Sequence, residues 1–125
     1  MLYDHIDLRV TNFEKVRALY DAILPALGFS RLDEGPEDIN YHRPAKNHAE
    51  PFFGLMLDPK HRPNGSRIAF RVDSRQEVDR IANVARNAGA RAFEPAETYD
   101  ADHPYYYATF FEDADGNKLE VVYRE

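Results

Sequence analysis

The sequence predicts an α+β fold made of two copies of one strand–helix–strand–strand–strand unit, written βαβββ below. Residues 5–10 and 67–72 both alternate apolar and polar side chains with a period of two, as half-buried strands do. The second stretch begins 62 residues after the first, and each is followed by apolar residues at helical spacing. Each helical pattern runs to a glycine, Gly28 or Gly89, suited to the left-handed turn that ends a helix.

The two helical patterns keep the same offset, so that Val16 is the equivalent of Val78. Asn12 is the expected N-cap of the first helix, and Asp73 or Ser74 that of the second. Pro25 is expected to interrupt the end of the first helix, because proline lacks a backbone N–H.

Three further strands are predicted in each half. They cover residues 29–32, 39–42 and 52–57, and then 91–94, 105–111 and 118–123, with a tight turn at 113–117. The chain is thus expected to be one domain, 1–125, with module one at 1–58, a linker at 59–65 and module two at 66–125. A generic α+β domain could show such likeness by chance, but the shared offset, the paired glycines and the central linker favour a duplication.

Composition excludes several classes of protein. With 16 basic and 22 acidic residues the formal charge is -6, which argues against a nucleic-acid reader and is compatible with a cationic ligand. The absence of cysteine excludes disulfides, thiolate metal sites and a cysteine nucleophile. No apolar run approaches the length of a membrane span, and the first residues do not resemble a signal peptide. A cytoplasmic protein without a membrane partner is therefore expected.

Three segments of the chain resemble a known family. They are Tyr3-Asp4-His5-Ile6, Ile68-Ala69-Phe70 and Asp113-Ala114-Asp115-Gly116-Asn117-Lys118-Leu119-Glu120, which are similar to the vicinal oxygen chelate superfamily of glyoxalases, bleomycin-resistance proteins and extradiol dioxygenases. Ala114 stands where that family usually has proline. The resemblance implies two modules that pair into an open cup with the helices outside, a small-molecule ligand, and a homodimer. In many members the cup holds a divalent metal that chelates two substrate oxygens.

The resemblance places the catalytic candidates at His5, Arg67 and Glu120. His5 and Glu120 match metal ligands of the family, whereas Arg67 stands where a second histidine is usual. Arginine is always protonated and cannot coordinate a metal, so the site is one ligand short, and Arg67 is expected to pair with Glu120. The metal is therefore absent or a weakly bound Mn, Fe, Zn or Ni ion, unless a further histidine completes the site; the candidates are His42, His48, His61 and His103. In module one the equivalent of Glu120 is Gly54.

Five residues are candidates for substrate binding: Asp7, Arg9, His103, Tyr105 and Tyr107. Asp7 and Arg9 share the polar side of the first strand with His5. His103 precedes Pro104 and is expected in a loop at the rim, as a mobile acid or base or a solvated side chain. The tyrosines offer flat contact surfaces and hydroxyl groups, or they serve ordinary strand packing. The acidic run 33–38 is expected to be a solvated loop.

Three functions remain open at this stage. The first is a metal-dependent enzyme of the glyoxalase, epimerase or dioxygenase type, which needs a third ligand. The second is a metal-independent protein that binds or sequesters a drug-like molecule, as in the bleomycin-resistance branch. The third is a metal-free lyase or isomerase in which Arg67 stabilises an oxyanion, while His5 or Glu120 transfers a proton.

Overall fold

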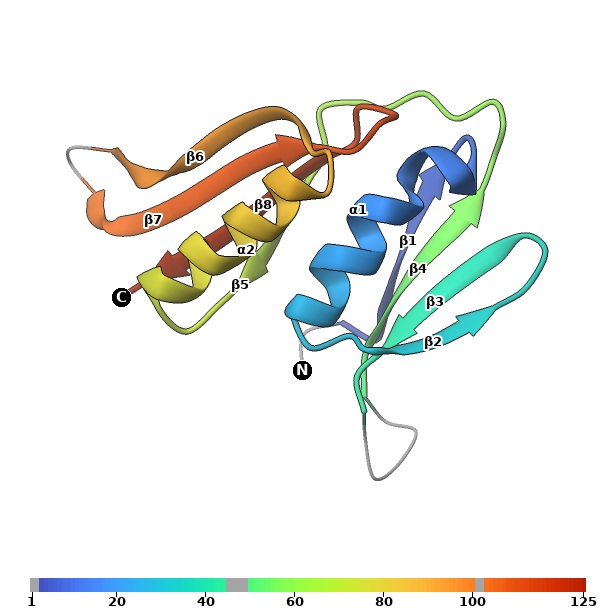
Figure 1. Ribbon diagram of the computed structural model, residues 1–125, viewed down its shortest axis with the longest axis horizontal. Helices are drawn as coiled ribbons and strands as arrows, with labels where there is room; N and C mark the ends of the chain where they lie inside the picture. Colours follow the sequence, from blue (N-terminus) through green and yellow to red (C-terminus); the bar gives the residue numbers. More distant parts are fainter. Residues whose placement is uncertain (1–2, 45–49, 101–102) are drawn as a thin grey trace. The chain divides into compact units, whose positions relative to one another are not determined.

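The structure is a computed structural model that describes residues 3–44, 50–100 and 103–125 (Figure 1). The chain divides into two compact units, Met1–His61 and Arg62–Glu125. The division falls within the segment 59–65 that the sequence marks as a linker. We call the units module one and module two and describe each by itself.

Module one is a four-stranded mixed sheet with one helix (Figure 1). The strand order is β1-β4-β3-β2, with β1 parallel to β4 and the other pairs antiparallel. Its elements are β1 (His5–Val10), α1 (Phe13–Ala26), β2 (Arg31–Glu34), β3 (Asp38–His42) and β4 (Phe52–Leu57).

Module two repeats this topology with the order β5-β8-β7-β6, in which β5 is parallel to β8. Its elements are β5 (Arg67–Arg71), α2 (Arg75–Asn87), β6 (Arg91–Asp100), β7 (His103–Glu112) and β8 (Lys118–Arg124). The predicted pair of βαβββ modules is therefore confirmed.

In each module the helix covers one face of its own sheet. Tyr20 of α1 stacks on Phe53 of β4, and the hydroxyl of Tyr41 on β3 donates to Asp21 of α1 at 2.6 Å. In module two the helix buries its apolar stripe, as its period of 3.6 requires; the stripe is Val78, Ile81, Ala82 and Ala85. We call the opposite face of each sheet, turned away from the module's own helix, its far face.

Local signals fix the ends of both helices. The side chain of Asn12 accepts a hydrogen bond from the backbone of Lys15, and that of Ser74 accepts one from Glu77. Gly28 and Gly89 adopt positive φ angles of 99° and 93° just beyond the helices, as predicted.

The prediction for Pro25 is wrong, because α1 continues through it to Ala26. Proline has no N–H to donate to the preceding turn, but only one helical residue follows it, so little of the helix is affected. The last turn is held instead by the backbone N–H groups of Leu27 and Gly28, which donate to carbonyls of the preceding turn.

Several strand boundaries differ from the prediction. β2 begins two residues later than expected, and β6 extends to Asp100 instead of ending at Glu94. The acidic run is only partly a loop, because Asp33 and Glu34 belong to β2 and Asp38 to β3. An ion pair explains how Glu34 is accommodated there: Arg17 of α1 donates two hydrogen bonds to its carboxylate, at 3.0 and 2.9 Å.

No helix in the described parts of the chain is both long and apolar enough to cross a membrane.

Candidate functional site

The far face of module two is organised around Glu120. This residue of β8 pairs with Ala69 on β5 and with Phe110 on β7. Because paired residues point to the same side of a sheet, and residues two apart do so along a strand, Arg67 shares the face with Glu120. The side chain of Glu120 is only 4% exposed, so its carboxylate requires a polar partner.

That partner is the hydroxyl of Tyr106, which donates a short hydrogen bond to Oε2 of Glu120. Tyr106 was not among the residues chosen from the sequence. The strand alternation alone shows that Tyr106 and Tyr107 face opposite sides, but not which side is which. The signal that settles this is the β7–β8 register, in which Phe110 opposes Glu120 and therefore puts Tyr106 on the same face.

The structure corrects the choice of Tyr107. Its hydroxyl donates to Asp79 of α2 at 2.6 Å, and the guanidinium of Arg75 lies 4.9 Å from its ring centroid. Tyr107 therefore faces the helix and lies on the opposite side of the sheet from Glu120. Tyr105 alternates with Tyr106 and does not share its face; its side chain is exposed.

Arg67 does not form the predicted ion pair with Glu120; among the described residues no such pair is present. Its guanidinium carbon lies instead 4.8 Å from the centroid of the Phe110 ring, a cation–π contact. Tyr106 already satisfies the buried carboxylate, so Glu120 does not depend on a cation. The charge of Arg67 is thus held against an aromatic ring, and the residue is exposed.

The environment of Tyr106 keeps its phenol protonated. Burial raises the pKa of Tyr106 to about 12, and the hydrogen bond to Glu120 and the negative charge of that carboxylate act in the same direction. The positive charges of Arg124 and Arg67 oppose the rise. At neutral pH Tyr106 is therefore a hydrogen-bond donor, and Glu120 is the acceptor.

Tyr106→Phe is expected to flatten the fall of stability at alkaline pH. The folded state holds the phenolic proton more tightly than the unfolded chain, whose tyrosine pKa is about 10. The resulting stabilisation is fully present below pH 10 and is lost as the pH rises through about 12. Urea unfolding at several pH values between 8 and 11 measures the free energy of unfolding of the wild type and of the variant. We expect the difference between these two free energies to change by about 1 kcal/mol over this range.

Tyr105→Phe is the matched control, because it removes a neighbouring exposed hydroxyl that does not face Glu120. A Tyr106→Phe profile that runs parallel to the wild type over this range would contradict the assignment.

The far face of module one carries a row of three rings on adjacent strands. The imidazole of His5 on β1 stacks on Phe52 of β4 with centroids 4.6 Å apart, and the imidazole of His42 on β3 lies 5.0 Å from the same phenyl ring. His5 Nδ1 is 2.8 Å from Asp4 Oδ2, and this hydrogen bond is the main reason that the pKa of His5 is raised. In the described part of the chain, Nε2 of His42 is buried without a hydrogen-bond partner.

Gly54 is the equivalent of Glu120 in module one, as predicted. It pairs with Asp7 on β1 and with Asn40 on β3, as Glu120 pairs with Ala69 and Phe110. A Cβ atom added to Gly54 would lie 2.7 Å from Asn40 Oδ1 and 3.0 Å from Asp7 Oδ1. These two oxygens therefore occupy the place where module two carries a carboxylate.

The remaining predicted residues are placed as follows. Arg9 lies on the far face with His5 and Asp7, and its Nη1 is 3.5 Å from Oδ2 of Asp58. His103 begins strand β7, so the prediction of a loop is wrong for its backbone, whereas its side chain lies outside the described part of the structure. His48 also lies outside the described residues.

The donor set of module two does not fit a metal centre. Arg67 has no lone pair to donate to a metal, and one oxygen of Glu120 is engaged by Tyr106. In the described residues, no group of three or more His, Asp or Glu side chains is arranged to hold a metal ion. His5 and Glu120 belong to different modules, so a joint ligand set of these two stays a prediction.

The turn that precedes β8 sets the position of Glu120. The buried carboxylate of Asp113 accepts hydrogen bonds from the backbone of Asp115 and Asn117, at 2.9 and 3.0 Å, and from Nδ2 of Asn117 at 2.8 Å. Gly116 completes the turn with a φ of 93°. Since β8 begins immediately afterwards, this turn determines the register in which Glu120 meets β5 and β7.

Known proteins are similar to this chain over nearly its whole length. The Bacillus subtilis protein YqjT, which is uncharacterized, is 27% identical over 131 residues, covering 94% of this chain and 95% of its own. A glyoxalase/bleomycin resistance protein from Albidiferax ferrireducens has a similar structure, with a TM-score of 0.80, 24% identity and 100% of both chains covered. The fosfomycin resistance protein FosX from Mesorhizobium loti matches with a TM-score of 0.68 and 16% identity over 98% of this chain and 92% of its own.

These structural likenesses concern the fold alone, whereas the family is shown by the sequence. Residues 2–121 match the family described as Glyoxalase/Bleomycin resistance protein/Dioxygenase superfamily. The match includes both strands that open the modules and Glu120 of β8. The chain therefore belongs to the glyoxalase, bleomycin-resistance protein and dioxygenase superfamily.

Proposed function

We propose that this chain binds a small, polar, negatively charged molecule on the far face of module two, and that it does so without a metal. The observation that carries the proposal is the position of Arg67. It occupies in β5 the ladder position that His5 occupies in β1, on the same face as the buried Glu120. A guanidinium held there supplies permanent positive charge and a planar fork of donors, which suits a carboxylate or a phosphonate.

Glu120 and Tyr106 would recognise the polar remainder of the ligand. Oε2 of Glu120 accepts from the phenol, so its other oxygen is available to a hydroxyl or amide of the ligand. The phenyl ring of Phe110 contacts one side of the Arg67 guanidinium and thereby restricts the orientations that this group can adopt. His5, Asp7 and Arg9 stay predicted contributors from module one, and a homodimer stays predicted as well.

Arg67→Gln is expected to weaken binding of small anions at least tenfold, because it removes the charge but keeps hydrogen-bonding groups. The probes are oxalate, pyruvate and fosfomycin, each titrated by calorimetry against protein that was purified without chelator. Fosfomycin is included because the structurally similar FosX is described as a fosfomycin resistance protein. Metal content, measured by mass spectrometry on the same sample, is expected to stay far below one ion per chain.

Arg71→Gln is the matched control, because Arg71 lies on the same strand and the same face as Arg67. It is two residues beyond Ala69, on the side away from Arg67, and its guanidinium donates to the backbone carbonyl of Arg124. It should bind the anions as the wild type does. A stoichiometric metal in the wild type, or equal affinities of the wild type and Arg67→Gln, would refute the proposal.

A second candidate function is favoured by the buried carboxylate. A glutamate in a sparsely solvated position is suited to proton abstraction, and a fixed cation nearby can stabilise the oxyanion that forms. This would make the chain a metal-free lyase or isomerase. Proton NMR spectra of the same anions, recorded during long incubation with the protein, separate the two functions. New ligand resonances support the enzyme, and unchanged spectra together with binding support the binding protein.

A further inference from the structure

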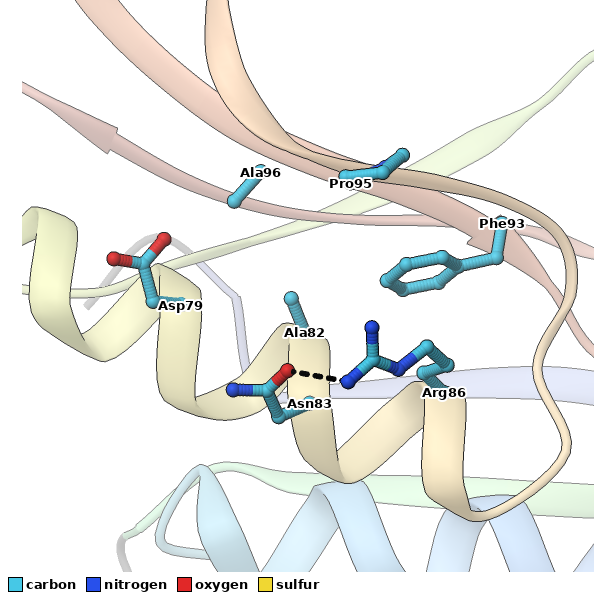
Figure 2. A pocket seen from close by; sticks show the side chains of 7 residues that line it. All are labelled: Asp79, Ala82, Asn83, Arg86, Phe93, Pro95 and Ala96. Atoms are coloured by element: carbon cyan, nitrogen blue, oxygen red, sulfur yellow. Dashed lines mark hydrogen bonds between the residues drawn. The ribbon is translucent and has the colours of Figure 1, made fainter.

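A groove of about 370 Å³ lies between α2 and β6, on the helix-covered side of module two (Figure 2). Its volume is within the range of sites that hold small molecules. It is separate from the face that carries Glu120, because α2 covers the opposite side of the sheet.

The irregular course of β6 explains why helix and strand leave this space. The register of β6 against β7 shifts between Arg91 and Glu94 and again between Glu94 and Glu97. Ala92 has a φ of 47°, in the left-handed region that side chains other than glycine rarely adopt. Such bulges bend a strand and disturb its contact with the layer above.

Arg86, whose side chain is exposed, supplies a positive charge at one end of the groove. Its Nη2 donates to Oδ1 of Asn83 at 3.1 Å, and the guanidinium extends toward the ring of Phe93 (Figure 2). Among the described residues no carboxylate forms an ion pair with Arg86.

The middle of the groove is apolar. Ala82, which is buried, forms the part contributed by the helix, while Phe93 and Pro95 form the part contributed by the strand (Figure 2). Asp79 lies at the far end of the groove, two helical turns or about 10 Å along α2 from Arg86. Its carboxylate accepts a hydrogen bond from the hydroxyl of Tyr107. The groove is therefore positive at one end, flat and apolar in the middle, and negative at the other end.

We propose that this groove binds a planar aromatic carboxylate. The carboxylate would accept hydrogen bonds from Arg86, whose planar fork matches it, and from Nδ2 of Asn83, the donor that the contact with Arg86 leaves available. The aromatic body would lie on Phe93 and Pro95. Asp79 disfavours a second anionic group at the other end and favours a hydrogen-bond donor there.

Benzoate is the probe for this site. In a titration followed by ¹H–¹⁵N NMR spectra of the whole chain, we expect shifts of the backbone signals of residues 79–86 and 93–96. Benzamide, which has the same ring without the charge, should bind at least tenfold more weakly. Arg86→Gln and Phe93→Ala should each weaken benzoate binding at least fivefold, while their spectra otherwise remain those of a folded protein.

Arg80→Gln is the matched control, since Arg80 lies on the same helix but pairs with Glu77 and does not line the groove. It should bind benzoate as the wild type does. The backbone signals of residues 67–71 and 118–122 report separately on the anion site of the far face, so the same titration distinguishes that site from the groove. Equal benzoate affinity in the wild type and Arg86→Gln, or shifts confined to other residues, would overturn the proposal.

Discussion

Phe53→Ala is expected to lower the free energy of unfolding by about 4 kcal/mol, the largest effect of any substitution considered for this chain. Phe53 is 1% exposed and packs on Tyr20 of α1, with ring centroids 6.1 Å apart. Removing the ring therefore discards its transfer free energy and leaves a cavity between helix and sheet. Urea unfolding followed by circular dichroism measures the change.

The adjacent residue provides the control for Phe53. Phe52 is also aromatic but lies on the far face, where His5 and His42 stack on it, and it is partly exposed. Phe52→Ala should cost about 1 to 2 kcal/mol, because exposed surface contributes less and no closed cavity forms. Equal losses in the two variants would show that the faces of β4 are wrongly assigned.

Asp113→Ala is expected to destabilise the chain by about 3 kcal/mol. Asp113 is 1% exposed and accepts hydrogen bonds from the backbone of Asp115 and from the backbone and side chain of Asn117. Without its carboxylate these donors remain near a buried position without partners, which costs more than the bonds alone. The same variant should bind oxalate more weakly, because the turn sets the register of β8.

Asp73→Ala is the control for this substitution. Asp73 is exposed and precedes the N-cap Ser74, whose own side chain caps α2. Its replacement should change the free energy of unfolding by less than about 0.5 kcal/mol. Losses of similar size in both variants would indicate that the hydrogen bonds of Asp113 do not hold the turn.

The fold was predictable because its signals are local and occur twice. The alternation in residues 5–10 and 67–72, the caps Asn12 and Ser74, and the glycines Gly28 and Gly89 each act within a few residues. The same signals occur in the same order in both halves of the chain, at a constant offset. This repetition defines the βαβββ unit more firmly than either half would alone. The boundary errors in β2 and β6 arise where pairing with a neighbouring strand, rather than local propensity, decides the length.

The site was predictable only in part, because the local sequence pattern does not show which side chains meet across neighbouring strands. Glu120 and Arg67 follow from the family motif and the period of two. Tyr106 and Tyr107 are adjacent tyrosines, and only the pairing of Phe110 with Glu120 tells which of them meets the carboxylate. The prediction of an ion pair between Arg67 and Glu120 was wrong for the same reason. The hydroxyl of Tyr106, on strand β7, donates a hydrogen bond to the carboxylate of Glu120 instead.

The glycine at position 54 has a consequence for how the two halves of the chain can change. A carboxylate introduced at Gly54 requires its neighbours to move, because the new Cβ would lie 2.7 Å from Oδ1 of Asn40 and 3.0 Å from Oδ1 of Asp7. The amide of Asn40 donates to Asp38 at 2.8 Å, so moving it away from the new side chain would cost that hydrogen bond. An acid in module one would therefore displace the two side chains that now occupy its place, whereas the acid of module two is accommodated beside Ala69 and Phe110.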